Sequence, residues 1–236
     1  MIILAVDSSA VAASAALYED GKILGEFYCN TGLTHSQTLM PMINGLLKNS
    51  RIPLERVDLF AVSAGPGSFT GIRIGISTVK GLAFPTNKPC IGVSTLEAMA
   101  CNLSHLDATI CAVMDARCKQ VYNAIFRSTG GKLERLTEDR AIRAEDLAHE
   151  CEKYTKPLIL VGDGANLCYN VYGFQAQGAR LAPEPLLFQH ASGVAKAAIS
   201  AYQNGLAVSA DALMPIYLRP AQAERNLNRK RRNTLL

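Results

Sequence analysis

An apolar strand that stops at an aspartate, and a later strand that runs into a glycine turn and a helix, most limit how this chain can fold. Residues 2–6 form a continuous apolar run that ends at Asp7. The run 57–63 leads into Gly65-Pro66-Gly67, and a helix is expected from about residue 69 to residue 84. Continuous apolar runs are typical of strands buried on both faces. The first half therefore predicts a sheet that lies between helices.

The second half repeats this order of elements in a looser form. The run 109–114 ends at Asp115, and the run 158–161 leads into Gly162-Asp163-Gly164. A long helix is expected at 191–203, because its apolar residues recur at helical spacing. The sequence thus predicts an α/β fold of two related subdomains, each with a mixed sheet flanked by helices.

The length allows two small domains around real cores. The chain has 236 residues, of which 49% are hydrophobic, and a domain has about 150 residues as a rule of thumb. We expect an N-terminal subdomain at 1–104, a C-terminal subdomain at 105–220 and a basic tail at 221–236.

The basic charge of the chain is concentrated at its C-terminal end. From residue 219 onward there are six basic residues and one acidic residue, whereas the rest of the chain holds 18 basic and 19 acidic residues. Such a tail can bind RNA phosphates by releasing counterions, and a solvated terminus without a partner is the alternative. The residues expected to contact RNA are Arg225, Arg229, Lys230, Arg231 and Arg232.

Several protein classes are excluded by pattern. No apolar run approaches the roughly 18 residues of a membrane-spanning helix, and the first residues lack the basic start of a signal peptide. We therefore expect a cytoplasmic protein. The seven cysteines and four histidines form no CxxC, HxxH or HxxxH pair, so we expect reduced, buried thiols and no metal site.

Three turns carry residues that suit a phosphate or nucleotide. A carboxylate at the end of a buried strand can hold a magnesium-bound water, and glycines before a helix let backbone N–H groups approach a phosphate. The alternatives are an Asx turn after the first strand and plain strand-to-helix turns at the two glycine segments. The candidate nucleotide-binding residues are Asp7, Ser8, Ser9, Gly65, Gly67, Gly162 and Gly164.

Two glycines share one face of the helix expected at 69–84. Gly71 and Gly75 are four residues apart, so another element can approach the helix closely at this face. We interpret the pair as part of a helix–helix subunit interface; packing of the helix on its own sheet is the alternative. On the first interpretation, Gly75→Arg keeps the fold and abolishes partner binding.

Motifs along the whole chain up to residue 220 together resemble the TsaB (YeaZ) family. The block at residues 64–83 is highly specific. The matching segments are ILAVDSS (3–9), THSQTLMP (34–41), AGPGSFTGIRIG (64–75), KGLA (80–83), DAR (115–117), QVY (120–122) and PIYLRP (215–220).

The resemblance implies an ASKHA-type fold, shared with actin, hexokinase and Hsp70. It implies an accessory subunit in the synthesis of N6-threonylcarbamoyladenosine, next to the anticodon of tRNAs that read ANN codons. The implied partners are a catalytic paralogue (TsaD), a small ATPase (TsaE), tRNA through the complex, and a second copy when the chain is alone. No cofactor is expected to bind tightly, and ATP or ADP with magnesium is placed at the complex interface.

The resemblance also assigns the helices at about 35–48 and 69–84 to the subunit interface. The residues that this assignment implies are His35, Leu39, Ile43, Gly71, Ile74, Gly75, Thr78 and Leu82.

The catalytic paralogue has a metal-binding HxxxH where this chain has Thr95 and Met99. Neither side chain can replace a neutral imidazole as a metal ligand, so the chain is expected to be no enzyme on its own, although the family has also been labelled glycoprotease-like. Two alternatives stay open. One is an ATPase or kinase of the same fold that uses Asp7 and magnesium, and the other is a tRNA-binding module that acts through the tail.

Deleting residues 221–236 tests the role of the tail. If the tail binds RNA, the full chain should bind tRNA with an affinity that falls steeply between about 50 and 200 mM salt, because the tail neutralises several phosphates. The shortened chain should lose this binding. Filter binding over a salt series measures both chains, and equal salt dependence for the two would contradict the assignment.

Overall fold

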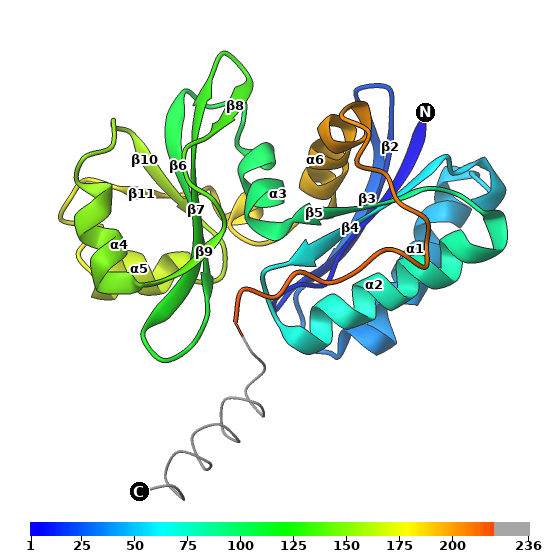
Figure 1. The fold of residues 1–236 in the computed structure, drawn as a ribbon, viewed down its shortest axis with the longest axis horizontal. Coiled ribbons are helices and arrows are strands. Elements are labelled where there is room, and N and C mark those ends of the chain that lie inside the picture. Colours follow the sequence, from blue (N-terminus) through cyan, green and yellow to red (C-terminus); the bar gives the residue numbers. More distant parts are fainter. Residues whose placement is uncertain (220–236) are drawn as a thin grey trace, which may run out of the picture.

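The computed structural model describes residues 1–219 as two α/β subdomains that lie side by side (Figure 1). Each has one mixed sheet with helices on both faces. The predicted α/β class with two related subdomains is therefore confirmed.

The first sheet has the strand order β3-β2-β1-β4-β5. The central strand β1 pairs antiparallel with β2 and parallel with β4. The strands are β1 (Ile2–Asp7), β2 (Ala13–Glu19), β3 (Lys22–Cys29), β4 (Leu59–Gly65) and β5 (Cys90–Ser94).

The second sheet repeats this topology. Its order read from the other edge is β8-β7-β6-β10-β11, so β6 takes the place of β1 and β10 that of β4; β9 also pairs with β7. Strands β8, β9 and β11 were not expected from the sequence. The strands are β6 (Ala108–Asp115), β7 (Gln120–Thr129), β8 (Lys132–Arg135), β9 (Arg140–Arg143), β10 (Leu158–Val161) and β11 (Arg180–Leu181).

The two faces of the first sheet build two separate cores. Because side chains alternate along a strand, Leu4 and Val6 of β1 pack into one cluster and Ile3 and Ala5 into another. Helices α1 (His35–Ser50) and α2 (Phe69–Ala83) cover the first of these faces.

The remaining helices are shared between the subdomains. Helices α4 and α5 cover one face of the second sheet, and α3 lies at the junction of the subdomains (Figure 1). Their bounds are α3 (Thr95–Asn102), α4 (Ala144–Cys151), α5 (Ala165–Val171) and α6 (Ala191–Gln203), with short 3-10 turns at Leu54–Arg56, Phe84–Thr86 and Glu184–Leu186.

Helix α6 does not follow the expected division of the chain at residue 104, which would place it in the C-terminal subdomain. The two sheets do lie on either side of that residue, but α6 packs on the first sheet, where Ala191, Val194 and Ala198 join Ile3 and Ala5. The physical reason is that β1 and β4 are apolar on both faces, so the face opposite α1 and α2 also needs a cover.

After α6, residues 206–219 form an extended segment that we call the strap. Val208 pairs with Cys90 at the edge of the first sheet, and Ile216 N–H donates to the Ala64 carbonyl at 2.7 Å. The strap then reaches the second subdomain, where Arg219 donates to the Ala116 carbonyl at 2.7 Å. It thus ties the two subdomains together.

Candidate functional site

A cleft of about 440 Å³ lies between the subdomains. It is formed by the turns that follow β1, β4, β6 and β10. In this fold class, ligands bind at the carboxyl ends of strands, so the cleft is the candidate site. Its lining residues are Ser9, Ala10, Val11, Gly67, Ser68, Phe69, Met114, Asp115, Ala116, Arg117, Tyr122 and Asp163.

The Asp7 carboxylate is buried and used within the chain. One oxygen accepts bonds from the Ser9 backbone N–H at 2.9 Å and the Ser9 hydroxyl at 2.7 Å. The other accepts from the Ser63 hydroxyl. Burial raises the pKa of Asp7, while these hydrogen bonds act in the opposite direction. Donors from the chain already engage both carboxylate oxygens. The ATPase alternative requires Asp7 to serve magnesium, and this arrangement does not fit that role.

The turn after β1 packs against the turn before α2. The Ser68 N–H donates to the Ser9 carbonyl at 2.7 Å, and the Ser8 hydroxyl donates to the Gly71 carbonyl at 2.9 Å. A Cβ at Gly67 would overlap the Ser9 carbonyl oxygen. A glycine is therefore needed at position 67 because the backbone of the same chain lies against it.

The other glycines of the predicted nucleotide site are also explained by contacts within the chain. A Cβ at Gly65 would overlap the carbonyl oxygen of Ile216 in the strap. A Cβ at Gly162 would overlap the carbonyl of Val113, and one at Gly164 would lie 3.0 Å from Met114 C.

Of the predicted nucleotide-binding residues, Ser9 and Gly67 line the cleft, and the other five are not among its lining residues. Nucleotide binding by this chain stays a prediction.

Asp163 is a cleft residue that the sequence reasoning did not select. Its Oδ1 is buried and has no hydrogen-bond partner within residues 1–219. Burial raises the pKa of Asp163 to about 6, and the nearby charge of Asp115 adds to the rise. The only sequence signal is its position between Gly162 and Gly164 after a buried strand.

The strap closes one end of the cleft region. The ring of Tyr217 stacks on Phe69 with centroids 4.5 Å apart, and its hydroxyl accepts a bond from Arg73 Nε at 2.8 Å. The Arg219 bond to Ala116 completes the link. The strap therefore links the two subdomains beside the cleft.

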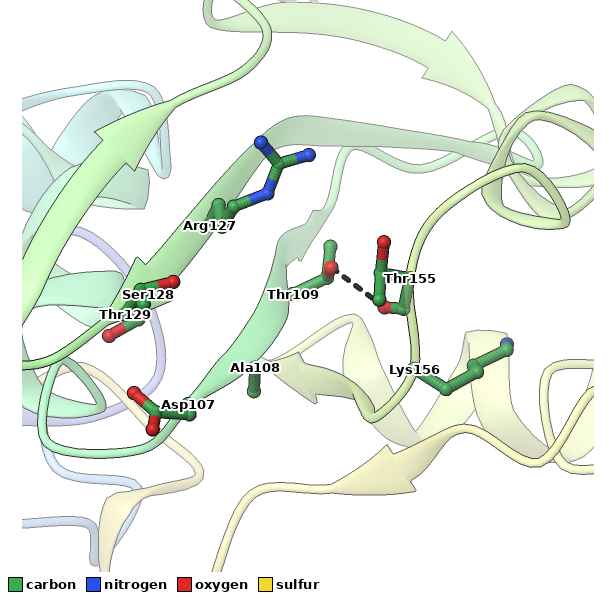
Figure 2. Close-up of a pocket in the computed structure, with 8 residues that line it drawn as sticks. All are labelled: Asp107, Ala108, Thr109, Arg127, Ser128, Thr129, Thr155 and Lys156. Atoms are coloured by element: carbon green, nitrogen blue, oxygen red, sulfur yellow. Dashed lines mark hydrogen bonds between the residues drawn. The ribbon is translucent and has the colours of Figure 1, made fainter.

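A second hollow, of about 190 Å³, lies at the opposite, amino end of the second sheet (Figure 2). Its polar groups join neighbouring segments: the Thr109 hydroxyl donates to the Thr155 carbonyl at 2.8 Å, and Asp107 accepts from the Gly130 N–H at 2.8 Å. None of the predicted site residues lines it.

The structure corrects the interpretation of the glycine pair. Gly71 and Gly75 face inward: a Cβ at Gly71 would overlap the Ser8 carbonyl oxygen, and one at Gly75 would lie 2.6 Å from Ser8 Oγ and 3.2 Å from Val62 Cγ2. The close neighbour is therefore the chain's own sheet and turn. The expectation that Gly75→Arg keeps the fold is wrong, because an arginine side chain at this position would enter the packed space next to Ser8 and Val62.

Two further residues of the predicted interface are also internal. Leu39 and Ile43 are 1% and 0% exposed in the core under α1, so they cannot contact a partner directly. His35 is half-buried and bonds the Ala10 carbonyl at 2.7 Å through Nε2. The remaining three residues, Ile74, Thr78 and Leu82, are half-buried on the flank of α2 next to α1.

Thr95 and Met99 are both buried at the junction of the subdomains. They are 0% and 2% exposed. Met99 packs in the core of the second subdomain, and its Cε would lie 3.1 Å from a Cβ at Gly162. The two positions thus serve as packing positions. The five predicted RNA-contact residues in the tail lie outside the described residues.

Within residues 1–219, no helix is both long and apolar enough to cross a bilayer.

Comparisons with known proteins converge on one family. A family model described as TsaD, tRNA N6-adenosine threonylcarbamoyltransferase, matches residues 30–227. The tRNA threonylcarbamoyladenosine biosynthesis protein TsaB of Bacillus subtilis is 29% identical, over 95% of this chain and 96% of that protein. The TsaB of Escherichia coli is 31% identical, over 93% and 95%. The solved structure of YeaZ from Pseudomonas aeruginosa is 28% identical, with a TM-score of 0.74 over 92% of this chain and 99% of that one.

Gly71→Ala tests the contact between α2 and the turn after β1. We expect it to lower the free energy of unfolding by about 1–3 kcal/mol, because overpacking outweighs the better helix propensity of alanine. Gly81→Ala is the control on the same helix: Gly81 is exposed with open space around it, so this change should be neutral or stabilising. Urea unfolding measures both variants, and equal stability of the two would contradict the contact.

Asp163→Asn tests the burial of the cleft carboxylate. The folded chain holds the Asp163 proton up to about pH 6, whereas the unfolded chain releases it near the ordinary pKa of an aspartate, 3.8. Folding is therefore penalised increasingly as pH rises through this range. We expect the variant to gain stability relative to the parent chain between pH 4 and pH 7, by urea unfolding. The prediction would be contradicted if Asp163→Asn gave no gain in stability over this pH range, or if the exposed control Glu138→Gln gave the same gain.

Proposed function

The chain belongs to the TsaB (YeaZ) family of tRNA threonylcarbamoyladenosine biosynthesis proteins, and from this premise we propose that it is a non-catalytic subunit that binds and activates a TsaD-type paralogue. The ASKHA-type fold is confirmed by the repeated strand order and by the match to YeaZ. The chain acts in the biosynthesis of threonylcarbamoyladenosine in tRNA. The proposed adenosine is the one beside the anticodon of ANN-decoding tRNAs.

The observation that supports a non-catalytic role is the identity and the burial of Thr95 and Met99. The catalytic paralogue is expected to hold a metal with two imidazoles at these positions, and this chain has a hydroxyl and a thioether that are packed in its interior. A neutral hydroxyl and a thioether are much weaker ligands than imidazole for the metals that imidazole binds. These two positions therefore do not fit a metal that would act as a Lewis acid on the transferred group.

The surface that supports partner binding lies between α1 and α2, and we call it the α1–α2 face. Along α1, Gly45 faces Phe27 of β3, so Met40 and Leu47 lie on the flank toward α2 because residues of a helix are 100° apart. Along α2, the flank away from the strap presents Ile74, Thr78 and Leu82. Met40 is 37% exposed and the other four are half-buried. This apolar strip has the shape of a helix-packing surface.

We place the nucleotide and the further partners in the complex with the paralogue and not on this chain alone. Because Asp7 is engaged by Ser9 and Ser63, we place ATP or ADP with magnesium at the junction with the paralogue and no tightly bound cofactor in this chain. A TsaE-type ATPase and tRNA join through the complex, which works in the cytoplasm. A second copy occupies the α1–α2 face when the chain is alone.

A binding measurement with a surface variant tests the proposal. The chain is mixed with the HxxxH-bearing paralogue of the same genome, and the dissociation constant is measured by calorimetry. Ile74→Glu should weaken the complex at least tenfold, about 1.4 kcal/mol, because a charge would be buried at the centre of the interface. The control Val171→Glu changes an apolar residue that is 64% exposed on α5 of the other subdomain.

Unfolding curves of both variants establish that they are folded. An unchanged dissociation constant for a folded Ile74→Glu would contradict the docking surface. Transferase activity of this chain without the paralogue would contradict the non-catalytic role.

A further inference from the structure

We propose that the α1–α2 face chooses its partner by charge: it favours an apolar surface rimmed by acidic side chains and disfavours a second copy of this chain. The inference rests on the proposed function, since it names the chemistry of the partner at the same surface. It also ranks the two occupants of that surface, the paralogue and a second copy.

The charges of the two helices have one sign. Helices α1 and α2 contain Lys48, Arg73 and Lys80 and no aspartate or glutamate. Arg51 follows at the C-terminal cap of α1. The apolar strip of the α1–α2 face is therefore flanked by basic side chains on both helices.

These basic side chains are largely not neutralised by the chain itself. Within residues 1–219, Lys48, Arg51 and Arg73 form no ion pair, and all three are exposed. Arg73 is held by a neutral group, the hydroxyl of Tyr217. Lys80 is the exception, since it bonds the Asp211 carbonyl at 3.0 Å. The pKa of the Asp211 carboxyl is lowered mainly by its hydrogen bond with Ser209, and the charge of Lys80 adds to this.

The acidic residues that follow α1 do not reverse this balance. Asp58 already accepts a bond from the Ile2 N–H at 2.8 Å and lies 4.0 Å from Lys88. Glu55 lies in the 3-10 turn after α1 and is accompanied there by Arg56. Counted together, α1, α2 and the segment 51–58 hold five basic residues and two acidic residues, so the face stays basic.

A symmetric dimer through this face would bring two basic rims together. An isologous interface places the same patch on both sides, so each cation would meet cations of the other copy. An acidic rim would instead meet opposite charges, which raises the association rate and suppresses wrong partners. Exposed charges are screened over about 10 Å at 0.1 M salt. The two complexes should therefore respond to salt with opposite sign.

The test measures both associations with the full chain at 50 and 500 mM sodium chloride. We expect the dissociation constant for the HxxxH-bearing paralogue to rise about tenfold with salt, and that for self-association, measured by sedimentation, to fall. A paralogue complex that is insensitive to salt or strengthened by it would overturn the inference while leaving the proposed function standing. If the paralogue does not bind at any salt, the proposed function fails and the charge inference fails with it. Self-association that weakens with salt overturns the charge inference alone.

A charge reversal separates the face from the basic tail. Lys48→Glu should weaken the paralogue complex about fivefold at 50 mM salt, strengthen self-association, and flatten both salt responses. The matched control Lys132→Glu makes the same change in net charge at an exposed position of β8, in the other subdomain. Equal effects of the two variants would show that net charge alone acts, and would overturn the inference.

Discussion

The backbone of the turn after β1 lies against the first residues of α2, and this contact positions the turns and side chains around the cleft. The carbonyl oxygens of Ser8 and Ser9 occupy the space that side chains at positions 71 and 67 would need. The same turn directs the Asp7 carboxylate inward to Ser63. It also fixes the rotation of α2, so that Ile74 and Leu82 turn toward α1 and away from the sheet. The geometry of the cleft and that of the α1–α2 face therefore depend on one close approach.

The main strands and helices could be predicted because their apolar residues follow the period of the element. β1 is apolar on both faces and is buried at every position, and α1 and α2 begin and end within a few residues of the expected places. β11 has only two residues and β8 has four, with exposed and half-buried positions alternating. Such short segments carry no apolar period long enough to detect, so they could not be found. The return of α6 to the first sheet is a tertiary choice that sequence order does not reveal.

The candidate site was harder to predict because its residues meet across long distances in the chain. The spacing of Gly71 and Gly75 shows that they share a helical face, but not whether that face meets the chain's own sheet or another subunit. The bond between Arg219 and Ala116 joins positions 103 residues apart. Asp163 is unusual only through what surrounds it, namely a buried oxygen without a partner and a second carboxylate nearby. The spacing of residues along the chain reveals none of these long-range contacts.

The turns around the central cleft are held by contacts within the chain. The glycine turns at the cleft meet carbonyl groups of the same chain, and the two positions that would hold metal ligands are packed with a hydroxyl and a thioether. Groups buried in this way cannot exchange their partners for a substrate without a loss of stability. The outer side of α1 and α2 keeps accessible apolar residues, and its Lys48, Arg51 and Arg73 form no ion pair within residues 1–219. Under the proposed function, association through these helices would require no change in the interior and would leave the chemistry to the partner.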